Sequence, residues 1–93
     1  MSGDDFERVA AAGYAVWRSA STAILPPWPY LDWKDRYWWR EAARMTSPAD
    51  IRRVCCTGLY ICGWHMLEPD QQFRWRLVAE AMQAERGAGH LVA

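Results

Sequence analysis

An aromatic-rich stretch, residues 27–45 (PWPYLDWKDRYWWREAARM), limits what this chain can fold into more than any other segment. It holds six of the thirteen aromatic residues of the chain. The prolines at its start force an extended approach and exclude a helix there. Asp32 then supplies an N-cap, and Asp35 adds a carboxylate to the first helical turn. The stretch therefore predicts a turn that leads into a helix over residues 33–45, which ends before Pro48.

The predicted helix has two different sides, because successive residues turn by about 100°. One side gathers apolar residues and predicts a contact with the core: Trp38, Trp39, Ala42, Ala43 and Met45. The opposite side carries arginines interleaved with aromatic residues: Trp33, Arg36, Tyr37, Arg40 and Arg44. We call this second set the Arg/aromatic face and expect it to point outward.

Three further helices are predicted from the spacing of apolar residues. The first covers residues 4–20. The third begins at the N-cap Ser47 and the proline that follows it, and its apolar pattern extends to about residue 66. The alternative is a helix that is broken near Gly63 and ends early. The fourth covers residues 69–86, with Gly87 as its predicted C-cap.

These elements predict an all-α fold, a compact four-helix domain. A chain of 93 residues is long enough for one core. We therefore expect a single domain over residues 1–93, with flexible ends at residues 1–3 and 88–93. Three tryptophans lie at core-facing positions of the predicted helices and are the expected anchors of the core: Trp17, Trp39 and Trp75.

The chain also matches itself when it is shifted by 36 residues. Five positions are then identical: Trp28, Leu31, Trp39, Arg40 and Ala43 fall on Trp64, Leu67, Trp75, Arg76 and Ala79. The shared pattern is W-x-x-L, a capping acid, and then a helix with an inward tryptophan. Two such units predict two helical hairpins related by a pseudo-twofold axis. The alternative is coincidence in a chain that is rich in tryptophan, arginine and alanine.

Composition and charge exclude several classes of protein. Hydrophobic residues make up 52% of the chain, which excludes a disordered protein. Eleven basic residues balance eleven acidic ones, so no net charge draws the chain to nucleic acid or to a membrane. The longest apolar run, residues 54–67, is too short to span a bilayer. Three cysteines make a poor disulfide framework and no signal peptide is recognised, so a cytoplasmic location is expected.

Cys55, Cys62 and His65 are the residues most suited to chemistry, because the predicted third helix places them on one face. A structural zinc ion requires four ligands, and only Cys56, off that face, or the distant His90 could complete the set. Buried cysteines and a core histidine explain the same residues. A nucleophile pair of Cys62 and His65 lacks any feature of an oxyanion hole. We therefore expect no metal, no cofactor and no catalysis.

The Arg/aromatic face admits three interpretations. Arginine and aromatic side chains can contact phosphates and stack on bases. The same residue types dominate the hot spots of protein–protein interfaces. They also occur on solvated helix faces, where arginine stems cover indole rings. Because the chain has no net charge, nucleic acid is the less favoured partner, and we expect a protein partner bound through this face.

Tyr60 and Trp64 form a second candidate surface. Both are predicted on the third helix, on the side opposite to Cys55 and Cys62. A helix that is apolar nearly all round is either central or has a second surface to cover. A homodimer through Tyr60 and Trp64 is therefore a further expectation.

Residues 14–44 carry a pattern that resembles small helical proteins of phages, mobile elements and actinobacterial genomes. The pattern is Tyr14-x-x-Trp17, followed by W-x2-L-x4-R-x2-W-x2-AAR from Trp28 to Arg44. This resemblance implies an accessory protein that binds a host protein as an inhibitor or adaptor, by analogy with anti-CRISPR proteins. The expected function is non-catalytic protein–protein binding. The alternative is a small nucleic-acid-binding or regulatory module that uses the Arg/aromatic face.

Overall fold

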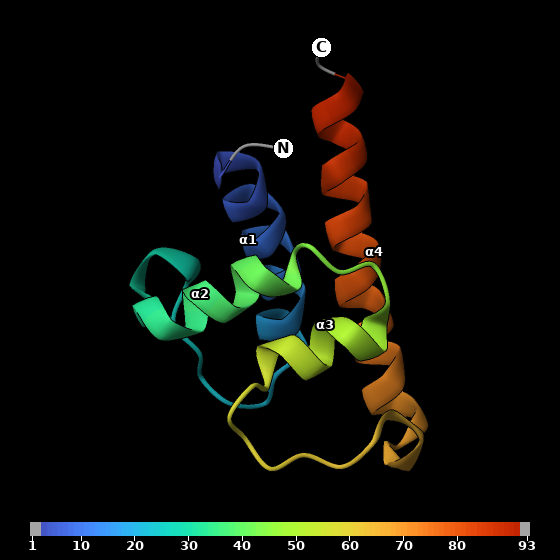
Figure 1. Ribbon diagram of the computed structural model, residues 1–93. Helices are drawn as coiled ribbons and strands as arrows, with labels where there is room; N and C mark the ends of the chain where they lie inside the picture. Colours follow the sequence, from blue (N-terminus) through green and yellow to red (C-terminus); the bar gives the residue numbers. More distant parts are fainter. Residues whose placement is uncertain (1–2, 92–93) are drawn as a thin grey trace.

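The computed structural model describes residues 3–91, and no strand occurs among them. Its elements are, in order, α1 (Gly3–Ser19), η1 (Trp28–Tyr30), α2 (Trp33–Ala42), α3 (Pro48–Cys55), η2 (Trp64–Met66) and α4 (Pro69–Leu91), where η denotes a 3-10 helix. α1 and α4 lie antiparallel and form the most extensive contact between helices, while α2 packs on α3 (Figure 1). The predicted all-α fold of four helices is confirmed, and α1 agrees with its predicted range to within one residue.

A row of five aromatic rings runs through the core. Successive ring centroids lie 5.8, 5.5, 6.2 and 4.2 Å apart along the series Trp28, Tyr14, Trp39, Trp75 and Trp17. Tilted, stacked and edge-to-face contacts at such separations add to the stability that burial provides. Trp39 and Trp75 are buried, as predicted, whereas Trp17 is half-buried and packs against the edge of the core.

Gly13 allows α1 to approach α4 closely. A Cβ atom at Gly13 would lie 2.5 Å from Met82 Cε and 2.9 Å from Met82 Cγ. Met82 is fully buried, so its side chain has no open space in which to retreat. The contact between the two longest helices therefore depends on the missing side chain at this position.

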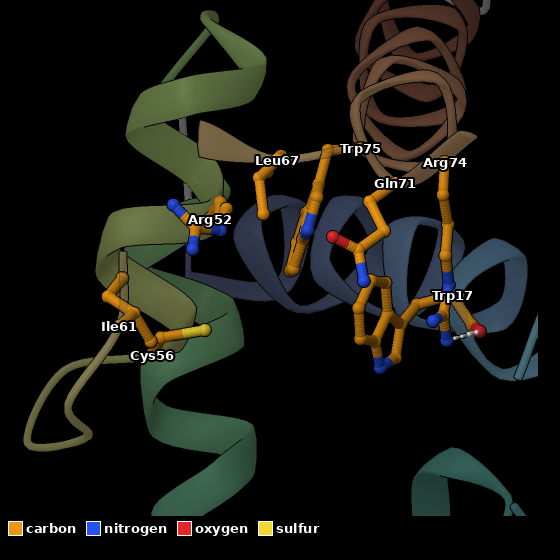
Figure 2. Close-up of a pocket in the computed structure, with 8 residues that line it drawn as sticks. All are labelled: Trp17, Arg52, Cys56, Ile61, Leu67, Gln71, Arg74 and Trp75. Carbon is orange, nitrogen blue, oxygen red and sulfur yellow. Dashed lines mark hydrogen bonds between the residues drawn. The ribbon is translucent and has the colours of Figure 1, made fainter. Parts of the chain in front are cut away.

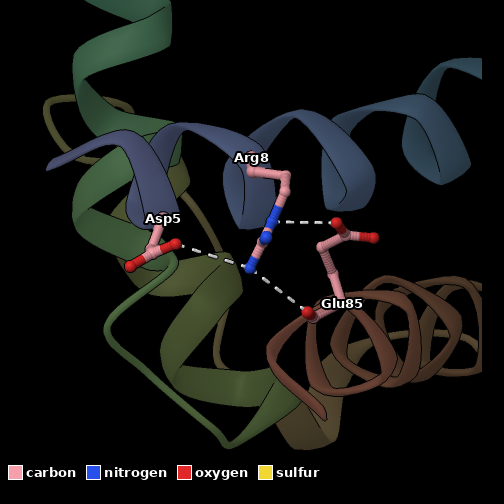
Figure 3. Close-up of polar contacts among 3 residues, drawn as sticks. All are labelled: Asp5, Arg8 and Glu85. Atoms are coloured by element: carbon pink, nitrogen blue, oxygen red, sulfur yellow. Dashed lines mark hydrogen bonds and ion pairs between the residues drawn. The ribbon is translucent and has the colours of Figure 1, made fainter. Parts of the chain in front are cut away.

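A polar contact joins the same two helices at their outer edge (Figure 3). Arg8 of α1 places its Nε 2.9 Å from Glu85 Oε1 of α4. The same guanidinium lies 3.6 Å from the carboxylate of Asp5, one turn earlier in α1. Because all three side chains are partly exposed, water screens these charges, and we ascribe the packing of α1 on α4 mainly to apolar burial.

The end of α2 is bound by an arginine of α4. The guanidinium of Arg86 donates to the carbonyl oxygens of Ala43 and Met45, the latter at 2.7 Å. Both carbonyls belong to the turn that follows the last helical residue, Ala42, so this contact ties that turn to α4. α2 ends at Ala42, three residues earlier than predicted, because a tighter turn places the N–H of Met45 on the carbonyl of Ala42.

α3 is much shorter than predicted. The apolar pattern predicted a helix to about residue 66, but α3 ends at Cys55. The hydroxyl of Thr57 donates to the carbonyl oxygen of Val54 at 2.7 Å, and Gly58 has a φ angle of 87°. Glycine adopts this left-handed conformation without steric cost, which commonly ends a helix. The apolar residues that follow belong to a loop, and their helical spacing was misleading.

α4 is longer than predicted. The helix was expected to end at Arg86, but it continues to Leu91, so Gly87 is not its C-cap and residues 88–91 are not a tail. A single glycine costs a helix only about 1 kcal/mol, which the flanking helical turns tolerate. Residues 1–2 and 92–93, which belong to the ends predicted as flexible, lie outside the described residues.

The repeat of 36 residues in the sequence is also a repeat of structure. α1 and α3 end 36 residues apart, η1 and η2 begin 36 residues apart, and so do α2 and α4. The residues that precede the two 3-10 turns have nearly identical φ and ψ angles, −62° and 158° at Pro27 and −65° and 159° at Gly63. We call α1–η1–α2 the first unit and α3–η2–α4 the second unit.

The two units interlock rather than stand as separate hairpins. α1 packs more extensively on α4 than on α2, and α3 packs more extensively on α2 than on α4. Trp39 and Trp75, which occupy equivalent positions, stack on each other with an interplanar angle of 22°. This self-contact of equivalent residues is the arrangement expected beside a pseudo-twofold axis.

Candidate functional site

The outer part of the Arg/aromatic face is exposed, as predicted. Trp33 and Tyr37 lie one turn apart on α2 and are 64% and 44% exposed. Lys34 Nζ lies 5.8 Å from the centroid of the Trp33 ring. These two aromatic side chains contribute little to the core, so their apolar area is available to a partner.

Of the three arginines of this face, Arg44 is exposed, as predicted, whereas Arg36 and Arg40 are only half-exposed. Arg40 Nη1 lies 3.0 Å from Glu7 Oε2 of α1. Arg44 Nε lies 3.7 Å from Glu41, and its guanidinium lies over the ring of Phe6 at 4.8 Å from the centroid. Helical periodicity shows which residues of α2 share a side of the helix. It does not show that α1 packs against that side.

Glu7 is the residue that ties the face to α1. Its carboxylate accepts a hydrogen bond from Trp28 Nε1 at 2.9 Å in addition to the one from Arg40. Burial alone would raise the pKa of Glu7. The hydrogen bonds from Trp28 and Arg40 and the positive charges of Arg40 and Arg36 outweigh this effect, so the pKa of Glu7 lies below its ordinary value of 4.5.

We expect Glu7→Gln to lower stability at neutral pH and to weaken the dependence of stability on acid. Because the folded-state pKa of Glu7 is lowered, its charge stabilises the fold above the ordinary value of 4.5, and this contribution is lost as the pH falls through the folded-state pKa. The effect is about 1 kcal/mol, since Glu7 and Arg40 are both more than a third exposed and water screens the pair. Thermal midpoints of the variant and the wild type should converge as the pH falls below 4.5.

Glu80→Gln, at an exposed position of α4, is the matched control and should change the midpoint little at any pH. A difference in thermal midpoint between Glu7→Gln and wild type that stays constant with pH would contradict the assigned role of Glu7.

The ion pair of Glu7 with Arg40 also predicts that Arg40→Glu lowers the thermal midpoint. This substitution therefore cannot separate an effect on partner binding from an effect on stability.

Tyr60 and Trp64 do not share a helical face, because α3 ends before both of them. Tyr60 lies in the loop after α3 and is fully exposed. Trp64 begins η2, is half-buried and packs against the core. The predicted second surface is thus divided, and only Tyr60 is freely available. A homodimer through this region stays a prediction.

The end of α3 at Cys55 also separates the residues considered for metal or nucleophilic chemistry. Cys55 is on α3, Cys62 is in the following loop and His65 is in η2. Among the described residues, no group of three or more His, Cys, Asp or Glu side chains could hold a metal ion. The three cysteines are free thiols, and burial raises the pKa of Cys55 strongly.

Some exposed apolar residues repeat at the spacing of 36 residues that also relates the core residues of the two units. Nine large apolar side chains are exposed among the described residues, and six of these form three pairs that are 36 residues apart. The pairs are Ile24 with Tyr60, Tyr30 with Met66, and Tyr37 with Phe73. Each of the six is at least 44% exposed. We call the first members the first apolar surface and the second members the second apolar surface.

Sequence reasoning identified Tyr37 and Tyr60 but missed the other members of these surfaces. The shift of 36 residues was the signal that could have found them, because it pairs Tyr37 with Phe73 in the sequence alone. That shift predicts which positions are equivalent, but not whether an equivalent position is exposed. The exposure of Ile24 and Tyr60 follows from their positions in loops, which only the structure shows.

Comparison with known proteins identifies no relative: no protein-family model, no curated protein and no solved structure matches the chain. The resemblance to small phage proteins therefore stays a prediction. Within the described part of the chain, no helix is both long and apolar enough to cross a membrane.

Proposed function

We propose that this chain is a non-catalytic protein-binding protein with two equivalent docking surfaces, the first and the second apolar surface. The observation that supports this proposal is the repetition of exposed apolar side chains at equivalent positions of the two units. Folding explains why core residues such as Trp39 and Trp75 repeat, because both units bury them. It gives no reason for Tyr37 and Phe73 to repeat, since both project into water.

The chemistry of the pairs points in the same direction. The paired residues differ in identity, Ile with Tyr, Tyr with Met and Tyr with Phe, but all six are large and apolar. An exposed position accepts polar residues at little cost to stability, whereas large exposed apolar side chains favour association. A binding function shared by both units would account for these exposed apolar side chains.

We infer a protein partner that presents one apolar surface twice, such as a symmetric dimer. Tyrosine, which supplies three of the six side chains, is among the residues that dominate protein-binding hot spots. The nucleic-acid alternative is less well supported, because the chain has no net charge and Arg40 and Arg44 both lie beside carboxylates, those of Glu7 and Glu41. A partner held at two points gains affinity from both, often by a factor of about 100 to 10,000. A host protein, which the phage-like pattern implies, is the expected source.

The test uses Tyr37→Ser and Phe73→Ser, one variant for each surface, and captures proteins from host-cell lysate with and without nuclease treatment. We expect one partner to be retained by wild type, and either substitution to weaken its binding by about 100-fold, because each removes the benefit of two-point attachment. Leu59→Ser is the matched control. Leu59 is also exposed and apolar, but its equivalent in the first unit is Ala23, so binding should be unchanged.

Several outcomes would overturn the proposal. Loss of the partner on nuclease treatment would favour the nucleic-acid alternative. An effect of only one of the two substitutions would exclude equivalent surfaces. Light scattering on the purified chain that shows a dimer, broken by Tyr37→Ser or Phe73→Ser, would identify the occupant as a second copy of this chain instead of another protein.

A further inference from the structure

A pocket of about 200 Å³ lies between α1, α3, α4 and the loop after α3 (Figure 2). Apolar and aromatic side chains form much of its wall, including Trp17, Leu67 and Trp75. Two arginines, Arg52 of α3 and Arg74 of α4, also line it, and no acidic side chain of the described residues does. Figure 2 shows the arginines on opposite sides, with the two indoles between them. The pocket is therefore lined largely by aromatic rings, with the amide of Gln71 beside them, and it is positively charged.

Arg52 is a buried cation without an anionic partner. It is only 7% exposed. Its one hydrogen bond among the described residues runs from Nη2 to Cys62 Sγ at 3.6 Å, and sulfur is a weak acceptor. Asp50, on the same helix, pairs with Arg53 at 3.3 Å instead. Burial of a charge costs free energy unless the charge is paired and hydrogen-bonded. An anion bound beside Arg52 would therefore reduce this cost.

Arg74 is held in place on the other side of the pocket. Its guanidinium carbon lies 3.2 Å from the centroid of a Trp17 ring, and its Nη2 donates to the carbonyl oxygen of Trp17 at 2.8 Å. Its Nε is buried and has no hydrogen-bond partner among the described residues. Arg74 therefore adds a fixed positive charge to the pocket, with one donor still unused.

The repeated architecture supplies an internal comparison for both arginines. Shifted by 36 residues, Arg52 corresponds to Val16 and Arg74 corresponds to Trp38. The first unit thus forms the same helix–loop–helix arrangement with apolar residues at both positions. The fold of a unit does not require a guanidinium there, so the two arginines of the second unit need another explanation.

We propose that this pocket binds a small organic anion, an apolar body that carries a carboxylate or a phosphate. Arg52 would hold the anionic oxygens, because its planar donors match both groups in a two-point contact. The apolar body would lie along Leu67 and Trp75, towards Arg74. The volume lies below the roughly 300–1,000 Å³ of sites for larger ligands, which favours a ligand the size of a single ring. This inference does not depend on the proposed docking surfaces.

The test is a titration of the purified chain with benzoate, phenyl phosphate and the neutral benzyl alcohol, followed by the indole N–H resonances in NMR spectra. We expect benzoate or phenyl phosphate to shift the signals of Trp17 and Trp75 and to raise the thermal midpoint. Benzyl alcohol should bind about tenfold more weakly or not at all. Tighter binding of benzoate would assign a carboxylate ligand, and tighter binding of phenyl phosphate would assign a phosphate.

Arg52→Met tests the role of the buried cation, since methionine keeps most of the apolar stem. We expect it to weaken anion binding about tenfold or more and to leave the midpoint of the ligand-free chain unchanged or higher, because it removes an unpaired buried charge. Arg53→Met, at the exposed neighbouring position, is the matched control and should bind as wild type does.

Absence of any anion-dependent shift in wild type would overturn the proposal, whatever the variants do. Equal binding of benzyl alcohol and benzoate would exclude anion recognition. A strong loss of stability in Arg52→Met would show that the arginine serves the fold.

Discussion

We expect Trp39→Ala to lower the free energy of unfolding by about 3–5 kcal/mol. Trp39 is 7% exposed, stacked on Trp75 of the second unit and in edge-to-face contact with Tyr14. Truncation would leave a cavity bordered by both units, so neither unit alone could close it. Small domains are stable by only about 5–15 kcal/mol, so the thermal midpoint should fall by roughly 15–30 °C.

Trp33→Ala is the matched control for this substitution. It removes the same side chain from the same helix, but Trp33 is 64% exposed, so stability should change by no more than about 0.5 kcal/mol. Trp75→Ala, at the equivalent position of the second unit, should cost about as much as Trp39→Ala. Urea and thermal unfolding of the three variants would measure these differences. Similar losses for Trp33→Ala and Trp39→Ala would contradict the arrangement of the core.

The parts of the fold that could be predicted have local signals in the sequence. Asp32 caps α2 through a hydrogen bond from the N–H of Lys34, and Pro69 opens α4, as expected. The burial of Trp39 and Trp75 followed from helical spacing together with the repeat. Such signals depend on neighbouring residues alone, so they can be interpreted without knowledge of the tertiary structure.

The end of α3 could not be predicted in this way. The loop after Cys55 carries apolar residues at helical spacing, and a glycine is compatible with either a helix or a turn. The positive φ of Gly58 decides between them, and it depends on how the loop packs. Tyr60 is exposed for the same reason, although the periodicity placed it on a helix.

The candidate sites depended on contacts between residues far apart in the sequence. The pairing of Arg40 with Glu7 joins positions 33 residues apart, which no helical periodicity can reveal. The burial of Arg52 likewise arises where α3 and the following loop meet α4. Its equivalent in the repeat, Val16, was nevertheless visible in the sequence. Comparison of the two units at every position, including those that differ, would have drawn attention to Arg52.

Gly13→Val is expected to destabilise the fold by about 1–3 kcal/mol, because it inserts a branched side chain where α1 meets α4. The first atom of that side chain would lie 2.9 Å from Met82 Cγ and 2.5 Å from Met82 Cε. The far end of a methionine can move, but Cγ is close to the backbone of α4 and the side chain is fully buried. The two helices must therefore separate to accept the valine.

Met82→Ala in combination with Gly13→Val tests whether this contact is the cause. Met82→Ala alone leaves a cavity and should cost about 2–5 kcal/mol. In the double variant the valine occupies part of that cavity and meets no methionine, so the double variant should be more stable than the sum of the two losses predicts. A coupling of about 0.5–3 kcal/mol is expected for residues in direct contact. Additive losses in urea unfolding would show that Gly13 is needed for some other reason than its approach to Met82.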